Sequence, residues 1–249
     1  MNTTNRNTNN NTNNANGWQG VLLDLDGTLL DTLPDLAASA NESRRAVGMP
    51  LLDESLIRTF VGKGADNLIK RTLAGNLDAP EPDAAIYEQA RAVFFEHYRA
   101  TNGDRAVMYP GVRQGLEELM ALGLPMAVVT NKPHDFSVPL LERTGLMAFI
   151  DVVVGGDTCA KRKPDPEPIV FACQQLGIHP GASLTIGDSI NDALAAKAAG
   201  GAVVAVPYGY NEGNPVTDLP VDGIVDTIVH AVAWLQTNPT PQEQSETLK

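Results

Sequence analysis

The stretch VLLDLDGTLLD, from Val21 to Asp31, is an apolar run that ends in two carboxylates one residue apart. These are Asp24 and Asp26, and Gly27 and Thr28 follow at once. Removing even one carboxylate from water without a partner is costly. Because the run has the composition of a buried strand, we expect a positive group at its end, and a divalent cation is the first candidate.

Alternate residues of an extended strand point the same way, so Asp24 and Asp26 are placed to share one site. Gly27 allows close approach of the backbone, and Thr28 offers a hydroxyl and an amide. A turn that merely contains acidic residues is the structural alternative. An EF-hand loop starting at Asp24 is excluded, because its sixth position would be Leu29 where glycine is needed.

The rest of the chain predicts an α/β fold with a doubly wound parallel sheet, a Rossmann-like core. Helical patterns that end at glycines separate the later apolar runs, and this alternation is typical of parallel strands. We expect strands at Gly20–Leu25, Met126–Thr130, Phe149–Val154, Leu184–Gly187 and Ala202–Val206.

Residues 32–104 show helical patterns and no convincing strand, which is far more than a crossover needs. We therefore predict an inserted all-helical cap over 32–104, hinged at Asp31–Leu33 and Gly103–Met108. The catalytic core would comprise 18–31 and 105–235. An Asn/Thr-rich tail over 1–17 is expected to be disordered, and 236–249 to form a loose C-terminal tail.

Composition narrows the class of protein. The 249 residues are 43% apolar and carry a net charge of −12, which argues against a nucleic-acid surface. We expect no membrane span, because no apolar stretch approaches the ~20 residues that one needs. Two separated cysteines, Cys159 and Cys173, fit a reducing compartment, so a cytoplasmic location is expected.

Three further groups of polar residues fall at the ends of expected strands, where open parallel sheets bind ligands. Thr130 and Asn131 lie in VVTNKP, Lys163 in KRKPDPEP, and Asp188 and Asp192 in TIGDSINDALAA. Taken singly, each has an ordinary explanation as a turn, a solvated lysine or a helix cap. Together with the first stretch they indicate a site for a phosphoryl group and a metal.

The ordered set DxDGT, T-N, K-P and GDSxND resembles the haloacid dehalogenase superfamily of aspartate-nucleophile phosphatases. The resemblance runs from Gly20 to about Gly223. The segments RTFVGKGADNLIKRTL, GLPMAVVTNKP, FIDVVVGGDTCAKRKPDPEP and VAVPYGYNEG narrow it to the bacterial phosphoglycolate phosphatase family. That family carries a helical cap after its first strand.

This resemblance implies a role for each motif. Asp24 would be the nucleophile, and Asp26 would be the acid and base. Mg²⁺ would be held by the Asp24 carboxylate, the Asp26 backbone carbonyl and Asp188, with Asp192 holding a metal-bound water or orienting Lys163. The groups expected to bind the phosphoryl oxygens are those of Thr28, Thr130, Asn131 and Lys163.

The cap turn VGKGADNLI places Lys63 and Gly64 before an expected helix. Amides at a helix N-terminus attract anions, so we expect this turn to receive the carboxylate of 2-phosphoglycolate. An ordinary loop with an exposed lysine is the alternative. Lys63 resembles the Schiff-base lysine of phosphonate-cleaving relatives, but those carry a small residue where this chain has Asp26.

The motifs and the resemblance together imply a Mg²⁺-dependent phosphatase acting on the small metabolite 2-phosphoglycolate, as a monomer or small homo-oligomer. A phosphosugar mutase or a pyrophosphatase of the same superfamily is the alternative within the enzyme class. A non-catalytic phosphate-binding scaffold is the alternative outside it. An inactive scaffold would be expected to have lost Asp24 or Lys163, and both are present.

Overall fold

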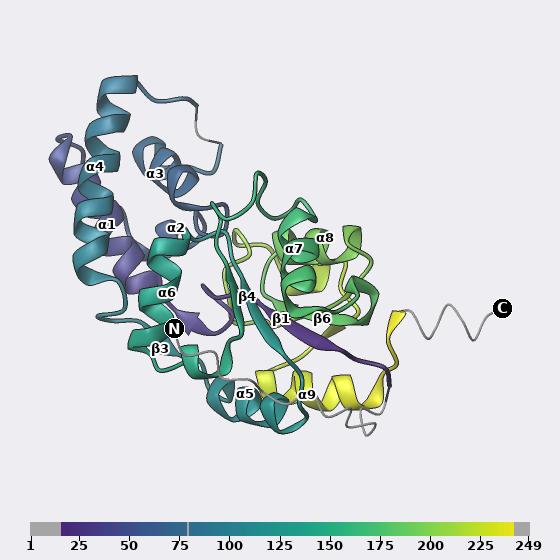
Figure 1. The fold of residues 1–249 in the computed structure, drawn as a ribbon. Helices are drawn as coiled ribbons and strands as arrows, with labels where there is room; N and C mark the ends of the chain where they lie inside the picture. The colour runs from purple at the N-terminus through teal and green to yellow at the C-terminus, as the bar shows by residue number, and fades with distance from the viewer. Residues whose placement is uncertain (1–15, 79, 242–249) are drawn as a thin grey trace.

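The computed structural model describes residues 16–78 and 80–241 (Figure 1). The predicted disordered tail at 1–17 lies outside the described residues apart from Asn16 and Gly17. Among the described helices, none is both long enough and apolar enough to cross a membrane.

The core is one sheet of six parallel strands in the order β5-β4-β1-β6-β7-β8. The strands are β1 (Gly20–Leu23), β4 (Met126–Val129), β5 (Val152–Val154), β6 (Ser183–Gly187), β7 (Ala202–Ala205) and β8 (Gly223–Ile224). The doubly wound parallel sheet is therefore confirmed, with all five expected strands present. Strand β8 was not predicted, because two residues are too few to show a pattern.

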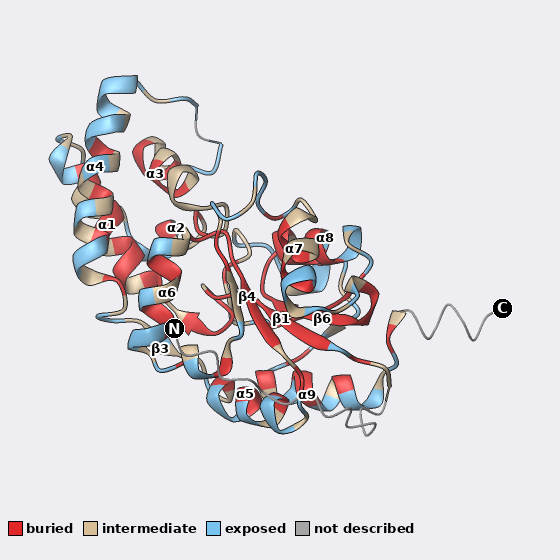
Figure 2. Cartoon of the chain, viewed as in Figure 1, coloured by how far each residue is buried: buried red, intermediate tan, exposed pale blue. Residues whose placement is uncertain are grey.

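Alternation along β1 explains how both faces of the sheet are covered. Val21 and Leu23 belong to a cluster with residues of α5 (Val112–Ala121) and α9 (Ile228–Thr237). Leu22 belongs to a second cluster with residues of α7 (Glu167–Leu176) and α8 (Ile190–Ala198). Figure 1 shows these two layers on opposite sides of the strands, and Figure 2 shows the strands buried between them. Burial on both faces is the reason that the strands read as continuous apolar runs.

Residues 32–104 form helices, as the sequence predicts. These are α1 (Leu33–Ala46), α2 (Glu54–Arg58), α3 (Ala65–Ala74) and α4 (Ala84–Thr101), and they share an apolar cluster distinct from those of the sheet. We refer to them as the cap. Helix α6 (His134–Arg143) of the core adds Phe136 to this cluster. The cap therefore has its own core and rests on the carboxyl edge of the sheet.

The two connections between the cap and the core pair with each other. Short strands β2 (Leu30–Asp31) and β3 (Val107–Met108) form an antiparallel ladder that the sequence did not predict. The buried Asp35 of α1 also accepts a hydrogen bond from the backbone N–H of Gly103 at 3.0 Å. The entry to the cap and its exit are thus fastened side by side.

The predicted loose tail from residue 236 differs from the structure. Helix α9 runs to Thr237, and Trp18 Nε1 donates to the carbonyl of Asn238 at 2.8 Å. Thr240 is buried. The prediction is wrong for 236–240, because these residues pack against the segment that leads into β1. Residues 242–249 lie outside the described part of the chain.

Candidate active site

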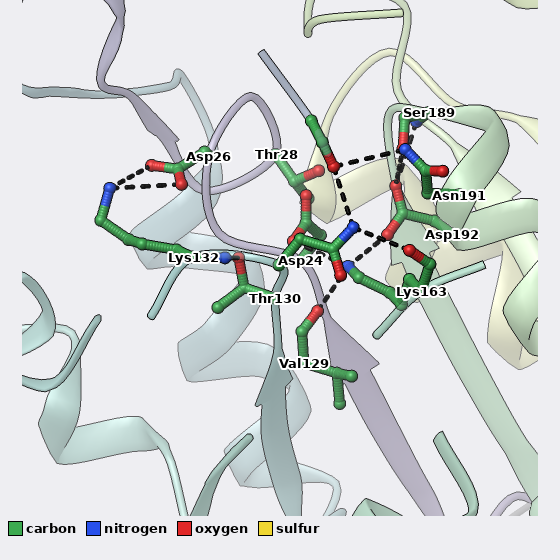
Figure 3. Close-up of polar contacts among 12 residues, drawn as sticks. Asp24, Asp26, Thr28, Val129, Thr130, Lys132, Lys163, Ser189, Asn191 and Asp192 are labelled. Carbon is green, nitrogen blue, oxygen red and sulfur yellow. Dashed lines mark hydrogen bonds and ion pairs between the residues drawn. The ribbon is translucent and has the colours of Figure 1, made fainter. Parts of the chain in front are cut away.

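The expected site residues of the core gather at the carboxyl ends of four neighbouring strands (Figure 3). Asp24 and Thr28 follow β1, Thr130 and Asn131 follow β4, and Lys163 lies in the loop after β5. Asp188 follows β6, and Asp192 lies in the first turn of α8. All seven are buried, so the parallel topology brings residues 24–192 into one compact group.

Lys163 lies between two of the carboxylates. Its Nζ donates to Asp24 Oδ1 at 2.9 Å, to Asp192 Oδ1 at 2.5 Å and to the carbonyl of Val129 at 2.6 Å. Burial alone would lower the pKa of this lysine, but the charges of Asp192 and Asp24 raise it above its usual value. The ammonium therefore stays charged in a site from which water is largely excluded.

The second carboxylate oxygen of Asp192 accepts hydrogen bonds from the residue that begins its own helix. The hydroxyl of Ser189 donates to Asp192 Oδ2 at 2.6 Å, and the backbone N–H of Ser189 donates to it at 3.1 Å. This is a capping box, in which the cap and the third helical residue satisfy each other. The carboxylate of Asp192 thus both caps helix α8 and orients Lys163.

Asp188 faces Asp24 without a lysine of its own. It accepts hydrogen bonds from the Thr28 hydroxyl at 2.8 Å and from the backbone N–H of Tyr210. Gly27 has a φ of +92°, and a Cβ there would collide with Asp188 and would lie 2.9 Å from the ring of Tyr210. Glycine is therefore required for the close approach of the first strand end to Asp188.

The negative charges of the Asp24, Asp188 and Asp192 carboxylates together favour binding of a cation. Burial is the main cause that raises the pKa of Asp24 to about 6, with Lys163 opposing the shift and Asp192 adding to it. Burial and then the negative charges of Asp24 and Asp192 raise the pKa of Asp188 well above its usual value. Carboxylates crowded in this way favour either protons or a cation.

The donor set fits Mg²⁺. Among the described residues, Asp24, Asp188 and Asp192 form a group whose ligand oxygens all lie within 4.8 Å of one another. Mg²⁺ prefers carboxylate, carbonyl and water oxygens. Because Asp192 is engaged by Lys163 and Ser189, Asp24 and Asp188 are the carboxylates best placed to hold the ion.

Asp26 has a separate set of partners, and one of them was missed by the sequence reasoning. Lys132 Nζ donates to Asp26 Oδ1 at 3.0 Å and to Oδ2 at 3.3 Å, and Thr32 Oγ1 donates to Oδ1 at 2.6 Å. The Lys132 ammonium also contacts the hydroxyl of Tyr98 from the cap. In Figure 3 this pair lies apart from Asp24 and Lys163. The two acids of the first stretch can thus sit close together because each meets its own lysine.

Lys132 was visible in the motif VVTNKP, but a lysine in a turn is usually solvated. What makes it different is burial, which a single sequence does not reveal: its side chain is 3% exposed. The charge of Asp26 and the contact with Tyr98 outweigh the effect of burial and raise the pKa of Lys132. The ammonium of Lys132 is therefore charged before any substrate arrives.

Asn131 connects three segments. Its side-chain Nδ2 donates to the carbonyls of Gly62 in the cap and of Lys163, each at 2.9 Å. Asn191 also donates to the Gly62 carbonyl, at 3.3 Å. The side-chain amide hydrogens of Asn131 are thus used to dock the cap turn and the lysine loop. Contact of this residue with phosphoryl oxygens stays a prediction.

The cap turn meets the site through its glycines. Gly62 and Gly64 line a cavity between the cap and the core, together with Asp24, Asp26, Lys132 and Lys163. The ammonium of Lys63 instead lies 2.8 Å from Glu212 Oε1, which also pairs with Arg71 at 2.7 Å. A role for Lys63 in substrate binding stays a prediction, and in this structure its charge is neutralised outside the cavity.

Comparison with known proteins identifies the family of this chain. The model of the family of haloacid dehalogenase-like hydrolases matches residues 21–206. Phosphoglycolate phosphatase of Thiobacillus denitrificans is 46% identical over 86% of this chain and 93% of its own length. Phosphoglycolate phosphatase of Nitrosospira multiformis is 45% identical over 88% of this chain and 96% of its own.

A solved structure has a similar fold. The crystal structure of a predicted phosphoglycolate phosphatase from Haemophilus somnus has a TM-score of 0.82 and 34% identity, covering 88% of this chain and 99% of that one. The matched region contains both ends of the described site, from Asp24 to Asp192. The chain belongs to the haloacid dehalogenase-like hydrolase family.

Proposed function

We propose that this hydrolase is a Mg²⁺-dependent phosphatase that converts 2-phosphoglycolate to glycolate and phosphate through an aspartyl-phosphate on Asp24. The observation that carries the chemistry is that Asp24 lines the cap–core cavity and is held by Lys163 at 2.9 Å. The substrate is proposed from the relatives, which are phosphoglycolate phosphatases at 45–46% identity over most of this chain.

In the first step, a carboxylate oxygen of Asp24 forms a bond to phosphorus, and the ester bond from phosphorus to the glycolate oxygen breaks. Asp26, in its protonated form, gives its proton to that oxygen, so glycolate leaves as an alcohol. Asp26 suits this task because it lines the same cavity and its carboxylate lies outside the group formed by Asp24, Asp188 and Asp192.

In the second step, Asp26 accepts a proton from water as the water oxygen bonds to phosphorus. The bond from phosphorus to Asp24 breaks, which releases phosphate and restores both carboxylates to their starting states. One residue thus serves as acid and then as base, and the hydrolysis is balanced without another reactant.

Lys163 supplies positive charge where the phosphoryl oxygens gather charge in the transition state. Asp24, Asp188 and the Asp26 backbone carbonyl would hold Mg²⁺, which when bound offsets the repulsion between the nucleophile and the phosphoryl oxygens. Thr28, Thr130 and the turn at Gly64 are proposed to line the bound substrate. Asp192 keeps Lys163 in place through the 2.5 Å contact.

A phosphosugar mutase or pyrophosphatase with the same core is the second candidate within the family. The test is phosphate release with Mg²⁺ from 2-phosphoglycolate, glucose 1-phosphate, pyrophosphate and phosphonoacetaldehyde. We expect a clear preference for 2-phosphoglycolate. Better turnover of another member of the set would keep the chemistry and contradict the substrate.

A further inference from the structure

Lys132 is a buried cation at the boundary between the core and the cap. Its ammonium contacts Asp26 on the core side and the Tyr98 hydroxyl on the cap side, and it lies 4.7 Å from the centre of the Tyr98 ring. Both Lys132 and Tyr98 line the cap–core cavity. A lysine that only balanced the charge of Asp26 would not need to face the cap or the cavity.

Apart from the backbone of the turn at Gly62 and Gly64, the described residues of the cap offer no charged group to an anion in this cavity. The cap contributes apolar side chains there, among them Leu36, Leu68, Phe94 and Phe95. A carboxylate placed against such a surface without a cation would be strongly disfavoured. Among the described residues that line the cavity, Lys132 and Lys163 are the cationic side chains, and Lys163 is committed to Asp24 and Asp192.

The chemistry of the proposed substrate matches this position. In 2-phosphoglycolate the carboxylate carbon is two covalent bonds from the oxygen that leaves phosphorus. Asp26 must reach that same oxygen to protonate it. A group that lies 3.0 Å from the Asp26 carboxylate is therefore close to where the substrate carboxylate must lie.

We propose that Lys132 binds the carboxylate of the substrate, an inference that rests on the proposed phosphatase function. The incoming carboxylate takes the place of Asp26 on the ammonium. Asp26 takes up a proton from solvent as it leaves the ammonium and is then free to give that proton to the leaving oxygen. A phosphate ester that lacks the carboxylate leaves Asp26 paired with Lys132, so this one lysine makes recognition of the acid group a condition for efficient turnover.

The test compares two esters in each variant. Ethyl phosphate has the same primary alkoxide leaving group as 2-phosphoglycolate but lacks the carboxylate. The measured quantity is the ratio of kcat/KM for 2-phosphoglycolate to kcat/KM for ethyl phosphate. Using a ratio cancels general damage to the site, and circular dichroism melting confirms that each variant is folded.

In the wild type we expect a ratio well above one. In Lys132→Gln, which keeps hydrogen bonding but removes the charge, we expect the ratio to fall by about 10- to 100-fold, the range for loss of a charged hydrogen bond. Tyr98→Phe leaves the ammonium in place without its hydroxyl partner, and we expect a fall of about 2- to 10-fold. If Lys132→Gln does not fold, the ratio measured in Tyr98→Phe tests the role of Lys132 instead.

The measured ratios distinguish failure of the proposed function from failure of the role of Lys132. A wild-type ratio near one would contradict the proposed function itself. A high wild-type ratio that survives Lys132→Gln, or an unchanged ratio in Tyr98→Phe if Lys132→Gln does not fold, would overturn the role of Lys132 alone. Collapse of the ratio in Lys63→Gln but not in Lys132→Gln would place the carboxylate at the cap turn and would also overturn it.

Discussion

Lys163 Nζ lies 2.9 Å from Asp24 Oδ1, and 2.5 Å from Asp192 on its other side. Replacing Lys163 with Met removes the charge that is proposed to stabilise the transition state. We expect kcat for 2-phosphoglycolate to fall by about 10²- to 10³-fold. Lys161→Met, in the same loop but exposed and paired with Asp165, is the matched control and should retain activity. Equal losses in both variants would contradict the role.

Metal binding should depend on pH in a way set by the raised pKa values. In the metal-free protein, Asp24 ionises near pH 6 in the folded state and near 3.8 when unfolded. Its contribution to stability is therefore present at low pH and lost as pH rises through about 6. Since Mg²⁺ binds the ionised carboxylates, we expect it to raise Tm more at pH 7.5 than at pH 5.

The control for this measurement is Asp188→Asn. It removes one proposed ligand and one of the crowded negative charges. We expect the variant to melt at a higher temperature than the metal-free wild type at pH 7.5 and to show a much smaller rise in Tm on adding Mg²⁺. A shift of Tm by Mg²⁺ that is the same in both proteins would mean that the ion binds elsewhere.

Gly27→Ala should be costly in two ways. A side chain at a φ of +92° is strained, and the added Cβ would meet Asp188 and the ring of Tyr210. We expect a loss of about 1–3 kcal/mol in the free energy of unfolding, measured by urea denaturation, together with weaker Mg²⁺ binding. Gly48→Ala is the control, because its φ is +73° but open space surrounds it. Equal losses at the two positions would show that the contact with Asp188 is unimportant.

Asn131→Ala should loosen the cap. The variant loses the hydrogen bonds to the carbonyls of Gly62 and Lys163, whereas Asn191→Ala loses only the weaker one to Gly62. We expect KM for 2-phosphoglycolate to rise about 10-fold or more in the first variant and less in the second. Steady-state kinetics on both variants measure this. A larger effect in Asn191→Ala would contradict the assigned importance of the two contacts.

Much of the fold was predictable from local patterns. Strands buried on both faces give unbroken apolar runs, as in β1, and helix α3 of the cap ends at Gly75, which has a φ of +71°. The strands β2, β3 and β8 have two residues each and leave no pattern. The packing of residues 236–240 was also missed, because it depends on Trp18 at the other end of the chain.

The candidate site was predictable to the extent that its residues follow strands. Parallel topology fixes where strand ends meet, so Asp24, Lys163 and Asp188 could be placed together before any coordinates. The direction of side chains could not be predicted: Asp26 turns to Lys132, and Lys63 turns to Glu212. Both choices depend on contacts between residues far apart in sequence, within the core for Asp26 and between the cap and the core for Lys63.

The most direct test of the account is whether Asp24 carries the phosphoryl group. Wild-type enzyme with Mg²⁺ and 2-phosphoglycolate would be quenched in acid within the first turnover and digested, and the peptide containing Asp24 would be analysed by mass spectrometry. We expect a phosphorylated Asp24 in the wild type, with neither this species nor phosphate release in Asp24→Asn. Sustained phosphate release by Asp24→Asn would contradict it.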